Sequence, residues 1–338
     1  MRRLARVLLS GQVLFVVGVA VLGFALIVAI VPSHKYLFLP DPAHPVAPLV
    51  RVTGGSDPTD GGGIYFVDVQ TRKATILESF APSIHKGADL YSPAAVNPQN
   101  VSPITLRAED LADMRRSHDV AAAVALRSLG EKVRATPNGI LITGVDPDAP
   151  AAAVLYPNDV IVAIDGAPTI TLNALARVMN GKKPGTTLSL SIRNARGLST
   201  VRVKTVNHNG QALIGLAIEQ DATIVLPRKV SIDSGDIGGP SAGLAFALDI
   251  VEELGRDVDH GHKVAATGEI FLGGGVGPIG GIKQKTYGAR RAGVDVFLVP
   301  AGENGTEARR YAGSLKIIPV KSFQQALRAL ATLYGGTQ

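Results

Sequence analysis

The chain has 338 residues, of which 46% are hydrophobic and 18% are charged. This composition suits folded cores and excludes a disordered protein, and the length favours two modest domains or one domain carrying an insertion. The chain has no cysteine, which excludes disulfides, thiolate metal sites and a cysteine nucleophile. The net charge is +6, but the basic residues are scattered and form no cluster interleaved with aromatics, so we expect no nucleic-acid partner.

The N-terminal segment predicts a membrane anchor. Arg2, Arg3 and Arg6 precede an uncharged apolar stretch, residues 12–32, which has roughly the twenty residues that a helix needs to cross the hydrocarbon core. The alternative, a cleaved signal peptide, usually has an apolar region of only about 7 to 15 residues. Because the arginines precede the span, residues 1–11 should be cytoplasmic and the rest of this single-pass protein extracytoplasmic.

The next segment connects the anchor to the folded body. Residues 33–63 are rich in proline and glycine, which predicts an extended tether. "IYFVDVQTRKATIL" then alternates on both sides of Thr71-Arg72 and predicts a hairpin. "AEDLADMRRSHDVAAAVALRSLG" predicts a helix that ends at Gly130. We therefore assign residues 33–117 to the tether and the N-terminal part of the main folded body.

A compact β-rich unit follows, which we place at residues 118–206. "GILITGV" and "VIVAIDG" predict strands, "TLNALARVMNG" predicts a helix, and "TTLSLSIRNARGLSTVRVKTV" predicts a hairpin. With "PAA" at 150–152, "PNDVI" at 157–161 and "IDG" at 164–166, the series resembles a PDZ domain of the kind attached to exported bacterial proteases. Family members usually have glycine where Asn158 stands, and asparagine tolerates the same left-handed conformation.

The PDZ resemblance implies a binding groove for a peptide that adds as an extra strand and places its terminal carboxylate on backbone amides. The expected groove lies beside the strand residues Gly139, Ile140, Leu141 and Ile142. An insert that binds no ligand is the alternative.

A serine at a helix entrance raises the question of catalysis. In "SIDSGDIGGPSAGLAFALDIVEEL", apolar residues recur at helical spacing after Ser241, which follows Gly239 and Pro240. Ser241 can be a simple helix cap, with Pro240 as an ordinary helix-entry proline. Alternatively, the glycines bring bare backbone close to a substrate, the N–H groups of the helix start stabilise an oxyanion, and the serine attacks. A serine nucleophile needs a base.

Lysine is the better candidate for that base, because none of the seven histidines has an evident catalytic setting. Lys283 and Lys285 stand near the start of a predicted helix and point about 200° apart. Lys285 shares its face with the small residues Ala289 and Ala292, which favours burial, whereas the face of Lys283 suits solvent. Burial would lower the pKa of the Lys285 amine and fit it for general-base work.

Three motifs together resemble the proteolytic domain of Lon proteases, a Ser–Lys peptidase family. They are "GGPSAG" with Ser241, "TGEI" with Thr267, and "PIGGIKQK" with Lys285. The resemblance implies that Ser241 is the nucleophile, Lys285 the general base and Thr267 the residue that orients the lysine, with Gly239 and Pro240 in support. One departure concerns Gly238, since many Lon enzymes have an acidic residue three before the serine.

The whole chain resembles the bacterial membrane-anchored, PDZ-containing Lon-like proteases. It lacks the phosphate-loop motif Gly-x-x-x-x-Gly-Lys-Ser/Thr that the ATPase module of Lon carries. The expected fold class is therefore α+β, with a Lon-type proteolytic domain at 207–338, an inserted PDZ-like domain and one transmembrane helix before them.

These features predict an ATP-independent serine endopeptidase that acts on unfolded or membrane-associated extracytoplasmic proteins. Its partners would be polypeptide substrates and the membrane, and we expect neither a cofactor nor a metal ion. Lon-like domains are often hexameric rings, so the resemblance also implies a homo-oligomer. The alternative is a catalytically silent PDZ adaptor on a protease-like scaffold.

Overall fold

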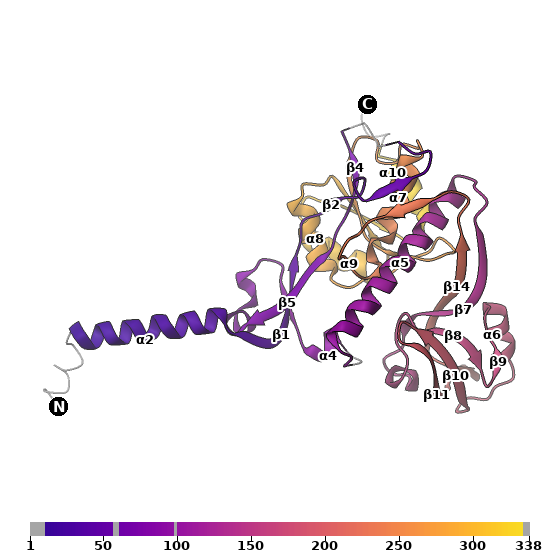
Figure 1. The fold of residues 1–338 in the computed structure, drawn as a ribbon, viewed down its shortest axis with the longest axis horizontal. Helices are drawn as coiled ribbons and strands as arrows, with labels where there is room; N and C mark the ends of the chain where they lie inside the picture. Colours follow the sequence, from indigo (N-terminus) through magenta and orange to yellow (C-terminus); the bar gives the residue numbers. More distant parts are fainter. Residues whose placement is uncertain (1–10, 57–60, 98–99, 334–338) are drawn as a thin grey trace.

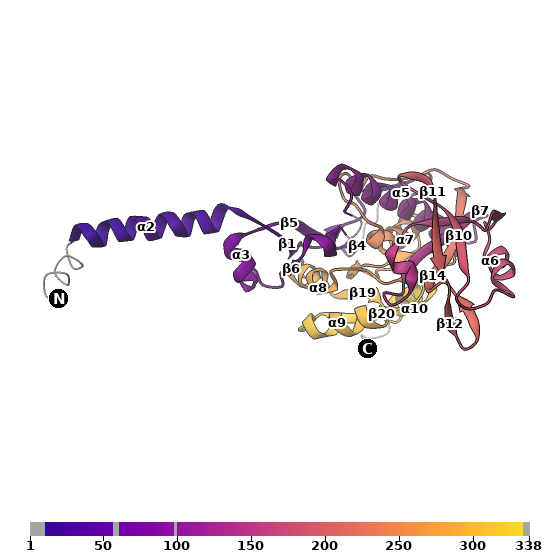
Figure 2. The ribbon, with the colours of Figure 1, turned by 90° about the horizontal axis from the view of Figure 1, so that it is seen from below.

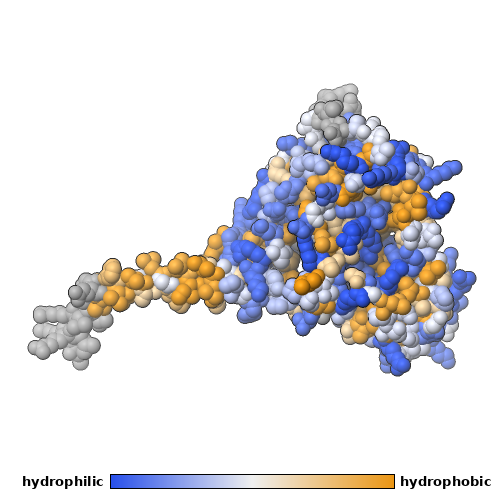
Figure 3. All heavy atoms as spheres, in the orientation of Figure 1, coloured by the Kyte–Doolittle hydropathy of each residue, from blue (hydrophilic) through white to orange (hydrophobic). Residues whose placement is uncertain are grey.

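A computed structural model describes residues 11–56, 61–97 and 100–333. A single helix projects from a folded body, and the body has two lobes (Figures 1 and 2). The projecting helix is α2, Gly11–Ile30, whose residues from Val13 onward are uncharged and face outward, which makes it an apolar rod in Figure 3. By length and composition this helix could cross a membrane. The cytoplasmic segment expected at 1–11 lies almost wholly outside the described residues.

The segment after α2 is folded, contrary to the expected tether at 33–63. Strand β1, Pro32–Pro40, is the centre of an antiparallel sheet between β5, Val69–Thr75, and β6, Asp89–Tyr91. Short helices complete this part of the body: α3, Ile76–Phe80; η1, Pro82–Ile84; and α4, Pro93–Val96. Leu37 of β1 is fully buried.

Residues 44–52 of the expected tether pack against the hydrophobic core of the main lobe. Val46 and Val50 have 0% of their surface exposed and belong to the largest hydrophobic cluster. Strands β2, His44–Pro45, and β3, Val50–Val52, pair with other parts of the chain. The prolines were misleading because proline is compatible with edge strands and turns, and the apolar residues between them supply the packing.

The main lobe is built on a mixed five-stranded sheet with the order β2-β4-β16-β19-β20. Apart from β2, the strands are parallel: β4, Gly63–Phe66; β16, Lys263–Ala266; β19, Val296–Pro300; and β20, Lys316–Val320. The helices of this lobe are α5, Pro103–Ser128; α7, Gly243–Glu253; α8, Ile282–Arg291; α9, Glu303–Tyr311; and α10, Phe323–Ala331. Helix α7 is buried along its whole length.

The hairpin predicted around Thr71-Arg72 is wrong. Strand β4 pairs in parallel with β16, whereas β5 pairs with β1 in a different sheet. The chain leaves one sheet and joins another at Val67–Asp68. Local alternation indicated extended structure here, but the predicted turn at Thr71-Arg72 lies inside β5 and α3 begins at Ile76. Partners distant in sequence decided the pairing.

The second lobe is the β-rich insert. Its main sheet has the order β11-β10-β8-β7-β14. The elements are β7, Arg134–Val145; η2, Pro150–Ala153; β8, Val160–Ile164; β9, Ala167–Pro168; α6, Leu172–Met179; β10, Thr187–Asn194; β11, Gly197–Lys204; and β14, Leu216–Val225. A small hairpin of β12, Val206–His208, and β13, Gln211–Leu213, precedes β14.

The boundaries proposed for this insert, 118–206, need correction. Residue 118 lies inside α5, which continues to Ser128, so no domain begins there. At the other end β14 pairs with β7 along residues 216–225, so the sheet continues past residue 206. Strands β15, Val230–Ile232; β17, Glu269–Ile270; and β18, Val276–Gly277 belong to the main lobe.

Close packing of the former tether on α8 gives a first prediction. A Cβ added to Gly288 would lie 1.9 Å from the backbone oxygen of Asp41. Gly288→Ala should therefore lower the free energy of unfolding by about 1 to 3 kcal/mol, measured by urea denaturation. Gly273→Ala is the control, since nothing lies within 4 Å of its added Cβ. Equal stability of both variants would contradict the packing of Asp41 on α8.

Candidate active site

Ser241 stands on a sharp turn between β15 and α7. Gly239 has φ 83° and ψ 154°, a backbone conformation that favours glycine. Pro240 then occupies the first helical position, where its missing N–H costs no hydrogen bond. The single turn η3, Pro240–Ala242, therefore carries Ser241 into the start of α7.

Lys285 and Lys283 lie on different faces of α8. Lys285 has 4% of its surface exposed, whereas Lys283 forms an ion pair with Asp89 at 2.7 Å. Gly281, in the left-handed conformation with φ 67°, directly precedes α8 and lets the loop enter the helix. The helical spacing thus places one lysine in the interior and leaves the other against a carboxylate.

The buried lysine meets the serine. Lys285 Nζ donates to Ser241 Oγ at 2.7 Å and to Thr267 Oγ1 at 3.3 Å. Thr267 Oγ1 donates to the backbone oxygen of Ser241 at 3.1 Å, and the Gly268 amide donates to the same oxygen at 2.8 Å. Residues from three motifs of the sequence therefore form one connected hydrogen-bond network.

Burial changes the protonation of Lys285. Removal from water disfavours the ammonium form and lowers the pKa of Lys285 from 10.5 to about 8, although the nearby Asp68 carboxylate acts in the opposite direction. A substantial fraction of the amine is therefore neutral near pH 8. A neutral amine can accept the proton of a hydroxyl at hydrogen-bond distance.

The pair opens into a cavity of about 590 Å³. Three acidic residues that the sequence did not single out also line it, Asp68, Asp110 and Asp236; Asp68 and Asp110 are partly buried. Burial raises the pKa of the Asp68 and Asp110 carboxyls. Nothing in the local sequence of Asp68 or Asp110 points to the site, because Asp68 follows an ordinary strand and Asp110 lies in the polar first half of α5.

Asp110 accounts for the unusual Gly238. A Cβ added at position 238 would lie 2.7 Å from Cβ of Asp110, so α5 occupies the space that a side chain there would need. The Gly239 amide also donates to the backbone oxygen of Asp110 at 2.9 Å. The turn therefore requires glycine at 238 while α5 packs against it.

The half-buried histidine of this region, His118, has a packing role. His118 stacks edge-on against Phe246 with ring centroids 5.1 Å apart. Burial lowers the pKa of His118 to about 4. Among the residues described, the side chain hydrogen-bonded to Ser241 Oγ is that of Lys285 alone.

Two groups of side chains come close enough to share a cation. Asp41, His44 and Asp68 form one, and Glu252, Asp257 and Asp259 the other, each with ligand atoms within 4.8 Å of one another. In the first group His44 already hydrogen-bonds Asp41 at 3.0 Å. We assign no metal to either group.

The expected peptide site at Gly139, Ile140, Leu141 and Ile142 is wrong. These residues belong to β7, which pairs with β8 on one side and with β14 on the other. A strand with both edges paired cannot accept a further strand. The sequence signals identified the correct sheet but gave no order for its strands.

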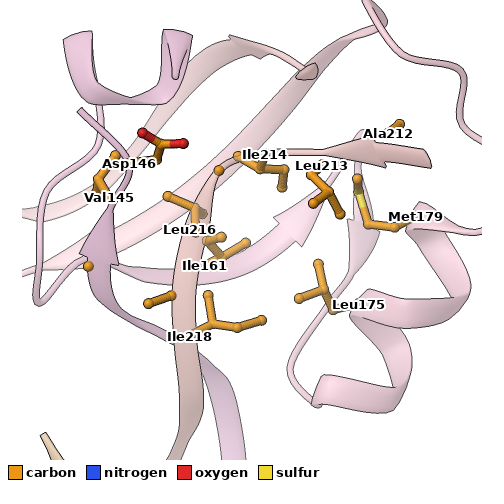
Figure 4. A pocket seen from close by; sticks show the side chains of 13 residues that line it. Val145, Asp146, Ile161, Leu175, Met179, Ala212, Leu213, Ile214, Leu216 and Ile218 are labelled. Atoms are coloured by element: carbon orange, nitrogen blue, oxygen red, sulfur yellow. The ribbon is translucent and has the colours of Figure 1, made fainter. Parts of the chain in front are cut away.

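A different groove lies at the edge of that sheet. Among the described strands β14 is outermost beside β7, and a cavity of about 540 Å³ separates it from α6. Leu175 and Met179 of α6 face Leu216 and Ile218 of β14 across this cavity (Figure 4). The lining is mostly apolar, with Asp146 at one end.

Comparison with known families supports both lobes. The family model "Lon protease (S16) C-terminal proteolytic domain" matches residues 220–332, and a PDZ domain model matches residues 127–205. The chain contains a Lon proteolytic domain and a PDZ domain. The expected combination of these two domains behind an apolar N-terminal helix is thus confirmed, and the Lon match supports a serine protease.

Several Lon proteases are similar to part of this chain. Lon protease 2 of Thermus thermophilus is 50% identical over 62 residues, 18% of this chain and 8% of that protein. Lon protease 2 of Bacillus subtilis is 36% identical over 109 residues, 32% of this chain and 18% of that protein. The matches therefore span less than a fifth of these relatives. Among solved structures, the PDZ domain of an SdrC-like protein from Listeria monocytogenes is 25% identical, with a TM-score of 0.24, over 25% of this chain and 92% of that one.

The depressed pKa of Lys285 predicts a stability effect. The pKa of Lys285 is about 8 in the folded protein and 10.5 in the unfolded chain. Below pH 8 the buried amine is charged, so the free energy of unfolding is lowered by the full amount. As the pH rises from 8 to 10.5, this loss of stability disappears. Lys285→Met should therefore raise the free energy of unfolding at pH 7 by on the order of 1 to 3 kcal/mol. Urea denaturation at several pH values measures it.

Lys283→Met is the matched control. Lys283 pairs with Asp89, and this interaction raises its pKa, so its loss should not stabilise the fold. A Lys285→Met variant that is no more stable than the wild type at pH 7 would mean that the ammonium is not destabilised by burial.

Proposed function

We propose that this protein is an ATP-independent serine endopeptidase with a Ser241–Lys285 dyad. The observation that carries the proposal is the 2.7 Å contact between Lys285 Nζ and Ser241 Oγ inside a protein interior that lowers the pKa of the lysine. Such a pair supplies a nucleophile and a base of suitable strength near neutral pH. The similarity to Lon proteases supports the same chemistry.

In this mechanism Ser241 Oγ attacks the scissile carbonyl carbon while its proton passes to Lys285 Nζ. The first N–H groups of the helical turn after Pro240 lack acceptors within the helix and can stabilise the oxyanion. Lys285 then returns the proton to the leaving amine, and the acyl-enzyme forms. Lys285 next takes a proton from a water molecule as the water oxygen attacks the acyl carbonyl carbon. The ester bond to Ser241 Oγ then breaks, the acid is released, and Lys285 returns the proton to Oγ. Thr267 Oγ1 contacts both Lys285 Nζ and the backbone oxygen of Ser241, and so keeps the two residues in place relative to each other during the reaction.

The substrate class follows from what surrounds the dyad. Neither lobe has the phosphate-loop motif of an ATPase, so the chain itself supplies no ATP-driven unfolding. We expect substrates that are already extended: unfolded proteins, flexible tails or membrane-protein ectodomains. If α2 crosses the membrane and the segment with Arg2, Arg3 and Arg6 stays in the cytoplasm, the dyad faces the extracytoplasmic side. Self-association is expected by similarity to Lon proteases.

The PDZ domain would hold an extended peptide in the groove between β14 and α6. An edge strand offers free backbone hydrogen-bond groups, and the apolar wall of α6 accepts alternate side chains of an added strand. This assignment replaces the one beside Gly139–Ile142. The bound segment would be the C-terminus of a substrate or of a regulatory protein.

Removal of either dyad residue tests the catalytic assignment. Ser241→Ala and Lys285→Ala should each lower kcat/KM for an unfolded polypeptide by at least about 10³-fold, because each removes a reacting group. Release of peptides from a casein-like unfolded substrate gives the rate. For the wild type, the rate should rise with pH through about 8 as Lys285 loses its proton.

Lys283→Ala is the control and should retain activity. A fluorophosphonate probe should label wild-type Ser241 and leave Ser241→Ala unlabelled. Full cleavage by either dyad variant would refute the assignment. A wild-type protein that binds peptides but neither cleaves them nor reacts with the probe would instead be a silent adaptor.

The groove assignment predicts a second outcome. Met179→Glu places a charge on the apolar wall of α6, so binding of a labelled peptide with a free C-terminal valine should weaken by about tenfold or more. Fluorescence polarisation measures the affinity, and Arg177→Glu is a control on the same helix. Unchanged binding in Met179→Glu would place the peptide elsewhere.

A further inference from the structure

We propose that Asn158 is a positioning residue that couples the PDZ domain to the Ser241 turn through helix α5. This inference rests on the proposed protease function and adds a structural control of that same site. It accounts for two departures from the usual family sequences, Asn158 and Gly238. Both positions contact α5, one from each lobe.

On the PDZ side, Asn158 is bound to two residues of α5. Its Nδ2 donates to Asp113 Oδ2 at 2.6 Å, and Arg116 donates to its Oδ1. The side chains of Asp113 and Arg116 are only 17% and 24% exposed, so these bonds are sheltered from solvent. A second link, Arg196 with Glu109 at 3.3 Å, lies further along the same helix.

The Asn158 side chain is not needed for the local backbone conformation. Asn158 has φ 75°, a value that glycine adopts without strain. Glycine would therefore suffice for the turn in "PNDVI". The asparagine side chain instead makes the two contacts across the lobes, which glycine could not make.

On the catalytic side, α5 holds the turn that carries Ser241. Three contacts follow the turn in chain order. Arg107 of α5 donates to Asp236 Oδ1 at 3.0 Å, and the backbone oxygen of Asp110 accepts from the Gly239 amide. Ser117 Oγ donates to the backbone oxygen of Pro240 at 3.1 Å. The last two of these contacts involve the two residues directly before the nucleophile. The position of α5 thus helps to fix the position of Ser241 and of the nearby amides.

The two sets of contacts occupy neighbouring stripes of one helix. The residues that contact the PDZ domain, 109, 113 and 116, are spaced by four and three and so lie on one face of α5. The residues that contact the Ser241 turn, 107, 110 and 117, are spaced by three and seven and lie on a second face. The two faces are about 100° apart around the helix axis. Within the 26 residues of α5 they overlap along the axis. A rigid helix moved by one set of contacts must therefore move at the other.

The experiment compares Asn158→Gly with the wild-type full-length protein. This change keeps the backbone conformation and removes both hydrogen bonds to α5. The expected result is a fall in kcat/KM of about 2- to 30-fold, carried by kcat, for a peptide too short to reach the PDZ groove. Fluorophosphonate labelling of Ser241 should slow in parallel, while the thermal midpoint changes little.

Asn209→Gly is the matched control. Asn209 also has positive φ, 52°, but is exposed at the tip of the β12–β13 hairpin and contacts neither α5 nor the turn. Its kcat/KM should equal that of the wild type. Wild-type kinetics in Asn158→Gly, or equal losses in both variants, would overturn the proposal.

Two further measurements make the result independent of turnover. Amide hydrogen exchange at residues 236–241 should accelerate in Asn158→Gly and not in Asn209→Gly; unchanged exchange would overturn the coupling. In a double-mutant cycle, Asp113→Ala should add little to Asn158→Gly, whereas full additivity would contradict a shared path. If the wild type neither cleaves nor labels, the proposed function fails, and the exchange comparison still decides the coupling.

Discussion

The hydrogen bond of a buried lysine to a serine hydroxyl is the constraint on which the catalytic arrangement in the C-terminal lobe depends. Burial of an ammonium group lowers the stability of a fold unless polar atoms accept its hydrogen bonds. Ser241 Oγ and Thr267 Oγ1 accept hydrogen bonds from Lys285 Nζ. Three separate elements must therefore converge: the turn before α7, the end of β16 and the first turn of α8. The parallel sheet provides this convergence, because β16 and β19 lie side by side and α8 connects to the latter.

Much of this site could be predicted from sequence because the signals are local. The 3.6-residue period of a helix separates Lys283 from Lys285, and glycine and proline before Ser241 mark a helix entrance. The order and spacing of three short motifs supplied the rest. The contributions of Asp68 and Asp110 could not be found in this way, since each belongs to an element distant in sequence from the dyad.

The errors share one physical origin, namely that strand pairing is non-local. The alternation in residues 64–77 predicted a hairpin with its turn at Thr71-Arg72, yet β5 runs through that turn, and β4 and β5 pair with β16 and β1 rather than with each other. For the same reason the predicted groove fell on an inner strand, β7. The strand with the free edge is β14, Leu216–Val225, which belongs to the PDZ sheet. It comes after the last PDZ motif in the sequence. The Lon family match already begins at residue 220, within this strand.

Strand β14 also determines how the two lobes are joined. Beyond the sheet, residues 222–225 of β14 pair with residues 134–137 of β7, so both connections to the PDZ domain form one hydrogen-bonded ribbon. A two-stranded ribbon flexes out of its plane far more easily than within it, unlike a pair of loose linkers, which would permit motion in every direction. The PDZ domain is thus joined to the main lobe by one paired ribbon rather than by two independent linkers, which restricts the directions in which it can move.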